Sequence, residues 1–333
     1  MITANFYNIK STNGLYFYGL DYLRENLDII RLVLVRSFLE EQIKVALPGV
    51  RVVACSYSRF VWEIIVACLR GDLLFTPTSH PLPFINRQWI ILHDAYPFAM
   101  GPRAKLKRIL LHLSLVLSRC RVGYINRSDA KSFLQRLGVA EARMVFAPNR
   151  FPEAVQRLAP WVVPSEGITK VGLLGTDSAK KNYGLLFNSV RRAELSEGLV
   201  FRVYGHETSY FNDIYAQFSD LNIQLVKSDD VRLEEFLNGV DVLASAAEQE
   251  GFGRPIAFAL LSGVAVELID CPVFREFFSG GARFHPNIET LVKSLPRDGT
   301  ELQAPPYAAP PDVISAYRLA NEEIRRLGSI ANR

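Results

Sequence analysis

Short, unbroken runs of apolar residues alternate with longer stretches of helical periodicity along almost the whole chain. Runs of this kind, without a polar residue at every second position, are typical of strands buried on both faces of a parallel sheet. Their alternation with helices predicts α/β units joined by right-handed crossovers. The expected strands fall into two series, 2–7, 29–34, 50–54, 73–76, 89–92, 122–125 and 144–147, and then 170–174, 200–204, 223–226, 240–244 and 264–268.

The segment 151–169 interrupts this rhythm, because it contains three prolines and has no clear period. We interpret it as a linker between an N-terminal domain, 1–155, and a C-terminal domain, 166–311. The helical pattern at 312–333 is interpreted as a C-terminal helix, for which packing back on the N-terminal domain is one option. A length of 333 residues also fits two cores better than one. The predicted fold is α/β, with two Rossmann-like, doubly wound parallel-sheet domains that face a cleft and bind ligands beyond the carboxyl ends of their strands.

The composition excludes several classes of protein. Hydrophobic residues make up 49% of the chain, which argues against disorder, and a net charge of +4 is too small to indicate a nucleic-acid partner. The four cysteines form no C-x-x-C pair, so neither a zinc knuckle nor a redox motif is predicted. The longest nearly uncharged apolar run, 109–118, is about half of the ~20 residues that span a bilayer. No signal-peptide pattern opens the chain. We therefore expect a cytoplasmic protein, either soluble or peripheral on the inner face of the membrane.

The stretch 241–263 carries the strongest local signal. A strand pattern runs into a turn with Gly251 and Gly253, and Pro255 stands where a helix would have its first residue. The free N–H groups of such a helix would suit a diphosphate. Glu250, at the same strand end, is suited to accept hydrogen bonds from sugar hydroxyls. The alternative interpretation is a tight turn before a core helix.

A second strand-end loop lies in 171–182, where Gly175 is followed by Lys180 and Lys181. Lysines in this place would neutralise a diphosphate and stabilise charge on a leaving phosphate. The alternative is a pair of solvated lysines. The glycine spacing differs from that of nicotinamide-binding proteins.

Taken together, these two stretches resemble the family-4 retaining glycosyltransferases of the GT-B fold. In the C-terminal half the resemblance rests on Ser245, Glu250-Gly251-Phe252-Gly253, Pro255, the Gly263-Val-Ala-Val strand and Glu276. In the N-terminal half, Asn13-Gly14 is similar to the family's glycine loop and His93-Asp94 to its acceptor-side element. Ser128 and Pro148-Asn149 also stand where the family has the same residues.

This resemblance implies transfer of a sugar from a nucleotide-diphosphate sugar with retention of configuration, the leaving phosphate helping to deprotonate the acceptor hydroxyl. Glu250 would hold the sugar hydroxyls, His93 would touch the sugar or the reacting oxygens, and Lys181 would bind the diphosphate. The implied donor-binding residues are Gly14, Gly175, Thr176, Lys180, Lys181, Asn182, Glu248, Gly251, Phe252, Gly253, Arg254 and Phe258. Asn13 and Asp94 would lie on the acceptor side. Enzymes of this fold usually need no metal and no D-x-D motif is present, so we expect neither metal nor cofactor.

The sequence departs from the family pattern in three places. Phe258 replaces a second glutamate that binds the donor ribose, and Thr176 replaces an arginine. Two inserted residues before Glu250 make Glu248 a competitor for its role. These departures leave open a catalytically inactive GT-B protein that binds sugar nucleotides, or a GT-B sugar-nucleotide epimerase.

The segment 95–128 contains no acidic residue and seven basic ones around an apolar run of helical length. Within it, 103–121 fits a helix lying in an anionic membrane interface, and it fits a buried helix with solvated basic ends equally well. The membrane interpretation suits a lipid-linked saccharide acceptor. The family resemblance implies that such an acceptor is used in the biosynthesis of a cell-surface polysaccharide, for example lipopolysaccharide, capsule or exopolysaccharide.

Overall fold

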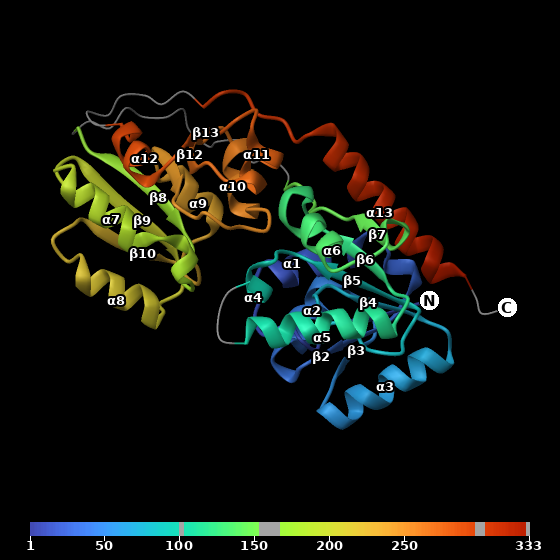
Figure 1. Ribbon diagram of the computed structural model, residues 1–333. Coiled ribbons are helices and arrows are strands. Elements are labelled where there is room, and N and C mark those ends of the chain that lie inside the picture. Colours follow the sequence, from blue (N-terminus) through green and yellow to red (C-terminus); the bar gives the residue numbers. More distant parts are fainter. Residues whose placement is uncertain (100–102, 153–166, 297–303, 331–333) are drawn as a thin grey trace. The chain divides into compact units, whose positions relative to one another are not determined.

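A computed structural model describes residues 1–99, 103–152, 167–296 and 304–330. Most of the expected linker, 151–169, lies outside these ranges, as does part of the loop 295–311. The chain divides into two compact units, which we call unit 1 (Met1–Arg150 and Pro311–Arg333) and unit 2 (Phe151–Pro310). Each unit is built on one parallel sheet with helices (Figure 1), so the predicted α/β class with two doubly wound domains is confirmed. Among the described helices, none combines the length and the apolar character needed to cross a bilayer.

The seven-stranded sheet of unit 1 has the order β3-β2-β1-β4-β5-β6-β7. Every pairing in it is parallel. The central strands β1, β4 and β5 are buried along their whole length, as their hydrophobic runs predict, and the edge strands β3 and β7 are partly buried. Their bounds are β1 Ile2–Asn5, β2 Ile30–Val35, β3 Val52–Ala54, β4 Leu73–Thr76, β5 Gln88–Leu92, β6 Arg121–Tyr124 and β7 Met144–Phe146.

The strand order of unit 1 reverses direction between β1 and β4, and this places its helices on the two faces of the sheet. Because crossovers are right-handed, the helices that lead to β2 and β3 cover one face and those that lead to β4, β6 and β7 cover the other. The first group is α1 (Gly14–Arg24) and α2 (Glu40–Ala46). The second is α3 (Tyr57–Leu69), α5 (Ala104–Leu117) and α6 (Ser132–Arg136), with the short α4 (Tyr96–Ala99) before α5.

The last helix, α13 (Pro311–Ser329), belongs to unit 1 although it follows unit 2 in the chain. The Tyr317 hydroxyl donates to the carbonyl oxygen of Asp21 at 3.1 Å, and its ring packs against Tyr22 with centroids 4.9 Å apart. Arg325 pairs with Asp28 at 2.8 Å. The helix therefore contributes to the core and surface of the first sheet's unit.

Unit 2 holds a six-stranded parallel sheet of order β10-β9-β8-β11-β12-β13, which reverses direction between β8 and β11. Its core is rich in aromatic side chains such as Phe187, Phe201 and Phe218. The sequence pattern does not predict β13, a three-residue strand whose first residue is exposed. The strands are β8 Thr169–Leu174, β9 Leu199–Gly205, β10 Ile223–Lys227, β11 Val242–Ser245, β12 Ala265–Ile269 and β13 Arg283–His285. The helices are α7 Tyr183–Arg192, α8 Ser209–Gln217, α9 Leu233–Asn238, α10 Arg254–Leu261, α11 Pro272–Phe278 and α12 Ile288–Ser294.

Candidate functional site

Three charged residues from two loops meet at the carboxyl edge of the sheet of unit 2. The loops follow β8 and β11, which are paired neighbours at the point where the strand order reverses. The Lys180 ammonium donates to Oε2 of Glu250 at 3.0 Å, and the Lys181 ammonium donates to Oε1 at 3.0 Å. All three side chains are largely shielded from solvent. A reversal point of this kind is where open α/β sheets bind ligands.

The loop after β8 is shaped so that Lys181 folds back over its beginning. Gly175 has φ of +86°, and a Cβ at this position would lie 2.9 Å from Cε of Lys181. The hydroxyl of Tyr183 donates to the carbonyl oxygen of Gly175 at 2.6 Å. Asn182 adopts a left-handed conformation and its amide donates to the carbonyl oxygen of Ala246 at 3.0 Å, which ties this loop to the loop after β11.

The charge of the cluster is set by this proximity. Burial would raise the pKa of Glu250, and the ammonium groups of Lys181 and Lys180 more than reverse this effect, so that its pKa falls to about 2. Glu250 is therefore ionised at neutral pH. Two ammonium groups meet one carboxylate here, and ammonium groups at a strand end can bind an anionic ligand.

The turn before α10 has the backbone that its glycines permit. Gly253 has φ of +90°, and α10 begins at Arg254, so Pro255 is the second helical residue and not the first as expected. A Cβ at Gly253 would lie 3.2 Å from Cδ1 of Ile256 and 3.4 Å from the rings of Phe274 and Phe278. The helix therefore starts close against α11.

The other predicted donor residues of unit 2 have different surroundings. Phe252 is buried among aromatic rings, 4.7 Å from the ring of Phe277, so its side chain is part of the core. Thr176 is also buried, and its hydroxyl donates to the carbonyl oxygen of His206 at 2.6 Å. Phe258 is half-buried on α10, as are Gly251 and Arg254 before and at its start.

Glu248 and Glu250 occupy distinct places although only one residue separates them. Glu248 is exposed and lines a separate cavity together with Arg192 of α7 and Asp270 after β12. Glu250, by contrast, is paired with the two lysines. This geometry favours Glu250 for a role beside a bound diphosphate.

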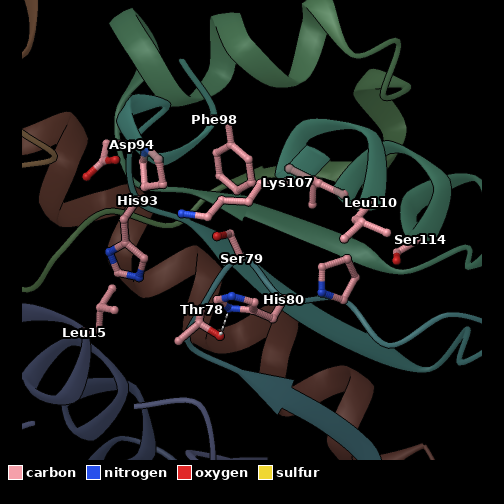
Figure 2. Close-up of a pocket in the computed structure, with 13 residues that line it drawn as sticks. Leu15, Thr78, Ser79, His80, His93, Asp94, Phe98, Lys107, Leu110 and Ser114 are labelled. Carbon is pink, nitrogen blue, oxygen red and sulfur yellow. Dashed lines mark hydrogen bonds between the residues drawn. The ribbon is translucent and has the colours of Figure 1, made fainter. Parts of the chain in front are cut away.

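A pocket of about 430 Å³ opens at the carboxyl ends of β4 and β5 in unit 1 (Figure 2). It is lined by the start of α1 (Leu15), by the connection from Thr78 to Pro81, by the predicted His93 and Asp94, and by α5. Figure 2 shows Lys107 of α5 lying across the pocket, with its ammonium group directed toward the side where His93 and Asp94 lie.

His93 is held in one tautomer by its surroundings. Its Nε2 lies 2.9 Å from the carbonyl oxygen of Pro77, which can only accept, so Nε2 carries the proton. Its ring packs edge-on against Tyr18, with centroids 4.7 Å apart. Burial lowers the pKa of His93 to about 4. The imidazole is neutral at physiological pH, and Nδ1 is left as an acceptor for a hydroxyl.

The pocket also contains two basic residues to which the sequence pattern assigns no role at a site, His80 and Lys107. His80 contacts the hydroxyl of Thr78 at 3.1 Å, and burial together with the nearby Lys107 and Lys10 lowers its pKa. These residues lie on separate elements from His93, so no local motif marks them. The folded chain alone brings them together.

Asn13 and Gly14 stand at the start of α1. The Asn13 side chain accepts from the backbone N–H groups of Leu15 and Tyr16, so Asn13 caps the helix. A Cβ at Gly14 would meet open space. In the part of the chain that the structure describes, no three His, Cys, Asp or Glu side chains lie together as a metal site would require.

Solved structures of similar fold cover the whole chain. HepE of Anabaena, solved with UDP and glucose, matches 98% of this chain and 97% of its own with a TM-score of 0.64 at 14% identity. WaaG, a glycosyltransferase involved in lipopolysaccharide biosynthesis, matches 100% and 96% with a TM-score of 0.63 at 12% identity. The chain has the GT-B fold.

A third GT-B structure, sucrose-phosphate synthase of Thermosynechococcus elongatus, matches 98% of this chain and 92% of its own with a TM-score of 0.64 at 11% identity. No family model and no curated protein matches the sequence. The similarity to these structures is therefore one of fold, and the chemistry depends on the residues of the site.

Proposed function

We propose that this GT-B chain is a glycosyltransferase of the family-4 retaining type, which moves a sugar from a nucleotide-diphosphate sugar to a saccharide or lipid-linked saccharide. The observation that carries the proposal is the cluster of Lys180, Lys181 and Glu250 at the reversal point of the second sheet. The cluster supplies two cations for a diphosphate and a carboxylate for sugar hydroxyls, and each ammonium nitrogen lies 3.0 Å from a carboxylate oxygen.

In the proposed reaction, the bond between the anomeric carbon and the phosphate oxygen breaks while the acceptor oxygen forms the new glycosidic bond. The acceptor proton passes to the departing phosphate. Lys181 and Lys180 stabilise the negative charge that develops on this phosphate, and they do so in a partly buried place where such contacts are strong. To bind the diphosphate, the lysines release part of their contact with Glu250, and Glu250 becomes available for the sugar. No metal is needed in this scheme.

The pocket of unit 1 is the proposed acceptor site. His93 offers a neutral imidazole nitrogen to a hydroxyl, and Lys107 adds a cation for a phosphate or carboxylate on the acceptor. Similarity of fold to WaaG agrees with an acceptor in cell-surface polysaccharide biosynthesis, such as lipopolysaccharide, capsule or exopolysaccharide.

The test is a thermal-shift screen of nucleoside diphosphates and their sugars, followed by hydrolysis and transfer assays with the donors that bind. UDP is the first probe because HepE was solved with it. A ligand at 100 times its Kd adds about 2.7 kcal/mol of stability. Turnover that is lost in Glu250→Ala and Lys181→Ala supports the proposal.

A catalytically inactive sugar-nucleotide binding protein is the second candidate, favoured by Phe258 in place of the family's second glutamate. Donor binding without hydrolysis or transfer would identify it. A GT-B epimerase would instead release free sugar from the donor without any acceptor.

A further inference from the structure

Helix α5 has two apolar sides, and only one of them faces the core. Ala104, Leu111 and Leu115 are buried against the sheet. The opposite side carries six exposed apolar residues at the spacing of one helix face, which we call the outward face of α5: Leu106, Ile109, Leu110, Leu113, Val116 and Leu117. With about 3.6 residues per turn, this face lies half a turn from the buried stripe. A helix of a soluble domain needs only one apolar stripe, so the outward face requires another explanation.

Helix α3 presents a second set of exposed apolar residues on the same side of unit 1. Its buried Phe60 and Ile64 pack on Leu74 of β4. Leu74 is on the same sheet face as Ile90, which packs with α5, because Thr76 pairs with Ile90 and lies two residues from Leu74. The exposed residues of α3 are Tyr57, Val61, Trp62, Ile65 and Leu69, with Trp62 63% exposed.

The loop between these helices holds an aromatic side chain out from the surface. Phe84 is 75% exposed and has φ of +66°, a conformation that is costly for a bulky residue. The buried Gln88 clamps this loop, since its side chain accepts from the N–H of Leu82 at 3.0 Å and donates to the carbonyl oxygens of Leu82 and Ile85. The structure therefore maintains Phe84 in its exposed position.

Contacts on both sides place this loop between the two helices. Leu82 and Ile85 pack against the cluster that contains Phe60 of α3. On the other side, the backbone N–H of Arg119, just after α5, donates to the Asn86 side chain at 2.8 Å. The two helices and Phe84 thus belong to one side of unit 1, which we call the docking surface.

The charges of the docking surface have one sign. Arg103, Lys105, Arg108 and Arg119 are exposed around α5, and 95–128 contains no acidic residue. The single acid of α3, Glu63, is mostly buried and lies 3.9 Å from Arg59. A second copy of the same face would bring cations against cations, so the surface does not complement itself. Its apolar residues with cationic borders complement an anionic bilayer.

We propose that the outward face of α5, the exposed side of α3 and Phe84 together dock this protein on an anionic lipid bilayer. Lys107 and Leu110 of α5 also line the pocket of unit 1, so this pocket opens at the rim of the docking surface. An acceptor with a lipid anchor can then enter the pocket from the bilayer. This assignment of a lipid-linked acceptor rests on the proposed transferase function, and the docking itself does not.

Flotation with phosphatidylcholine vesicles and with equimolar phosphatidylcholine–phosphatidylglycerol vesicles tests the docking. The protein should bind the anionic vesicles at low salt, and binding should weaken with added salt. Replacing both Lys105 and Arg108 by glutamine should reduce binding roughly 25-fold, about fivefold for each lost cation. Val116→Glu should reduce it roughly tenfold or more, because it removes an apolar contact and adds a repelled charge.

A matched control is Val45→Glu. Val45 is 82% exposed on α2 and Val116 is 65% exposed on α5, and α2 covers the opposite face of the sheet. Val45→Glu should bind vesicles like the wild type.

Involvement of α3 is measured by the fluorescence of Trp62 in a Trp161→Phe variant. The fully buried Trp89 is then the other tryptophan of the chain. The emission of Trp62 should shift to shorter wavelength with anionic vesicles.

Three results would overturn the docking proposal. They are equal binding of Val116→Glu and the wild type, an unchanged Trp62 emission on bound vesicles, and a wild-type dimer that Val116→Glu dissociates while no vesicle binds. Donor hydrolysis by Val116→Glu without vesicles separates the two proposals. Hydrolysis without vesicle binding would support the transferase proposal and overturn the docking proposal. Vesicle binding without any turnover would support the docking proposal and overturn the transferase proposal.

Discussion

The ammonium nitrogen of Lys181 lies 3.0 Å from Oε1 of Glu250, although 69 residues separate them in the chain. Lys180 binds the other carboxylate oxygen of the same glutamate. Glu250, which is proposed to bind the sugar hydroxyls, therefore also restrains Lys180 and Lys181, which are proposed to bind the diphosphate. Binding of donor and rearrangement of this ion pair are expected to be coupled.

This coupling predicts different effects for its two sides. Lys181→Ala should weaken binding of a nucleoside diphosphate roughly 10- to 100-fold, the loss expected for one charge-assisted contact. Glu250→Gln should leave this binding equal or tighter, because it releases both lysines, while sugar transfer is lost. Calorimetry with the diphosphate and an assay with the sugar nucleotide measure the two effects. Glu248→Gln is the control and should bind the diphosphate like the wild type. Equal weakening of diphosphate binding by Glu250→Gln and by Lys181→Ala would contradict the proposed coupling.

Gly175 should matter for binding more than its backbone conformation alone requires. Gly175→Ala places a methyl group 2.9 Å from Cε of Lys181, at a φ of +86°. Gly263→Ala has a similar φ of +74° with open space around the new methyl group. Each should destabilise the fold by about 1 kcal/mol through backbone strain. Only Gly175→Ala should also weaken diphosphate binding, and a similar affinity for both variants would show that Lys181 does not depend on Gly175.

The partly buried His93 should make stability depend on pH. Its pKa is about 4 in the folded chain, below the ordinary value of 6.5. Between these values the unfolded chain binds a proton that the folded chain does not, so the free energy of unfolding should fall as the pH decreases from 6.5 to 4, by about 3 kcal/mol in total. His93→Gln keeps an N–H for Pro77 and removes the titration. Urea unfolding of both proteins across this range should show the wild type losing more stability, and parallel curves would refute the assignment.

Lys107 and Lys105 lie on the same helix, and only Lys107 lines the pocket of unit 1. Lys107→Met should raise the KM for an anionic acceptor roughly tenfold while donor hydrolysis stays constant, because a contact to the acceptor is lost. Lys105→Met, assayed with a water-soluble acceptor and no vesicles, should behave like the wild type. An equal effect of both substitutions would point to a general loss of positive charge instead.

All twelve strands expected from the sequence overlap strands of the structure, because a strand buried on both faces leaves an unbroken apolar run that can be read locally. The thirteenth, β13, lies at the edge of its sheet and contains Arg283 and His285, so it has no such run. Its partner Glu267 is fully buried on β12 and pairs with both of these residues, at 3.2 Å and 2.5 Å. An edge strand held in this way depends on contacts that no local pattern contains.

The sequence by itself determined the two α/β sheets, the strand-end loops with Gly175, Lys181 and Glu250, and the run of basic and apolar residues in α5, since strand burial, turn chemistry and helix period are local properties. Only the tertiary structure decided that Lys180, Lys181 and Glu250 form one ion-paired cluster, that Phe252 is part of the core, and that His80 and Lys107 share a pocket with His93. It also decided that α3 and α5 expose apolar side chains on one side of their sheet. These relationships join residues from different strand-to-strand connections. The face of the sheet that each connection covers is a property of the folded sheet and not of the local sequence.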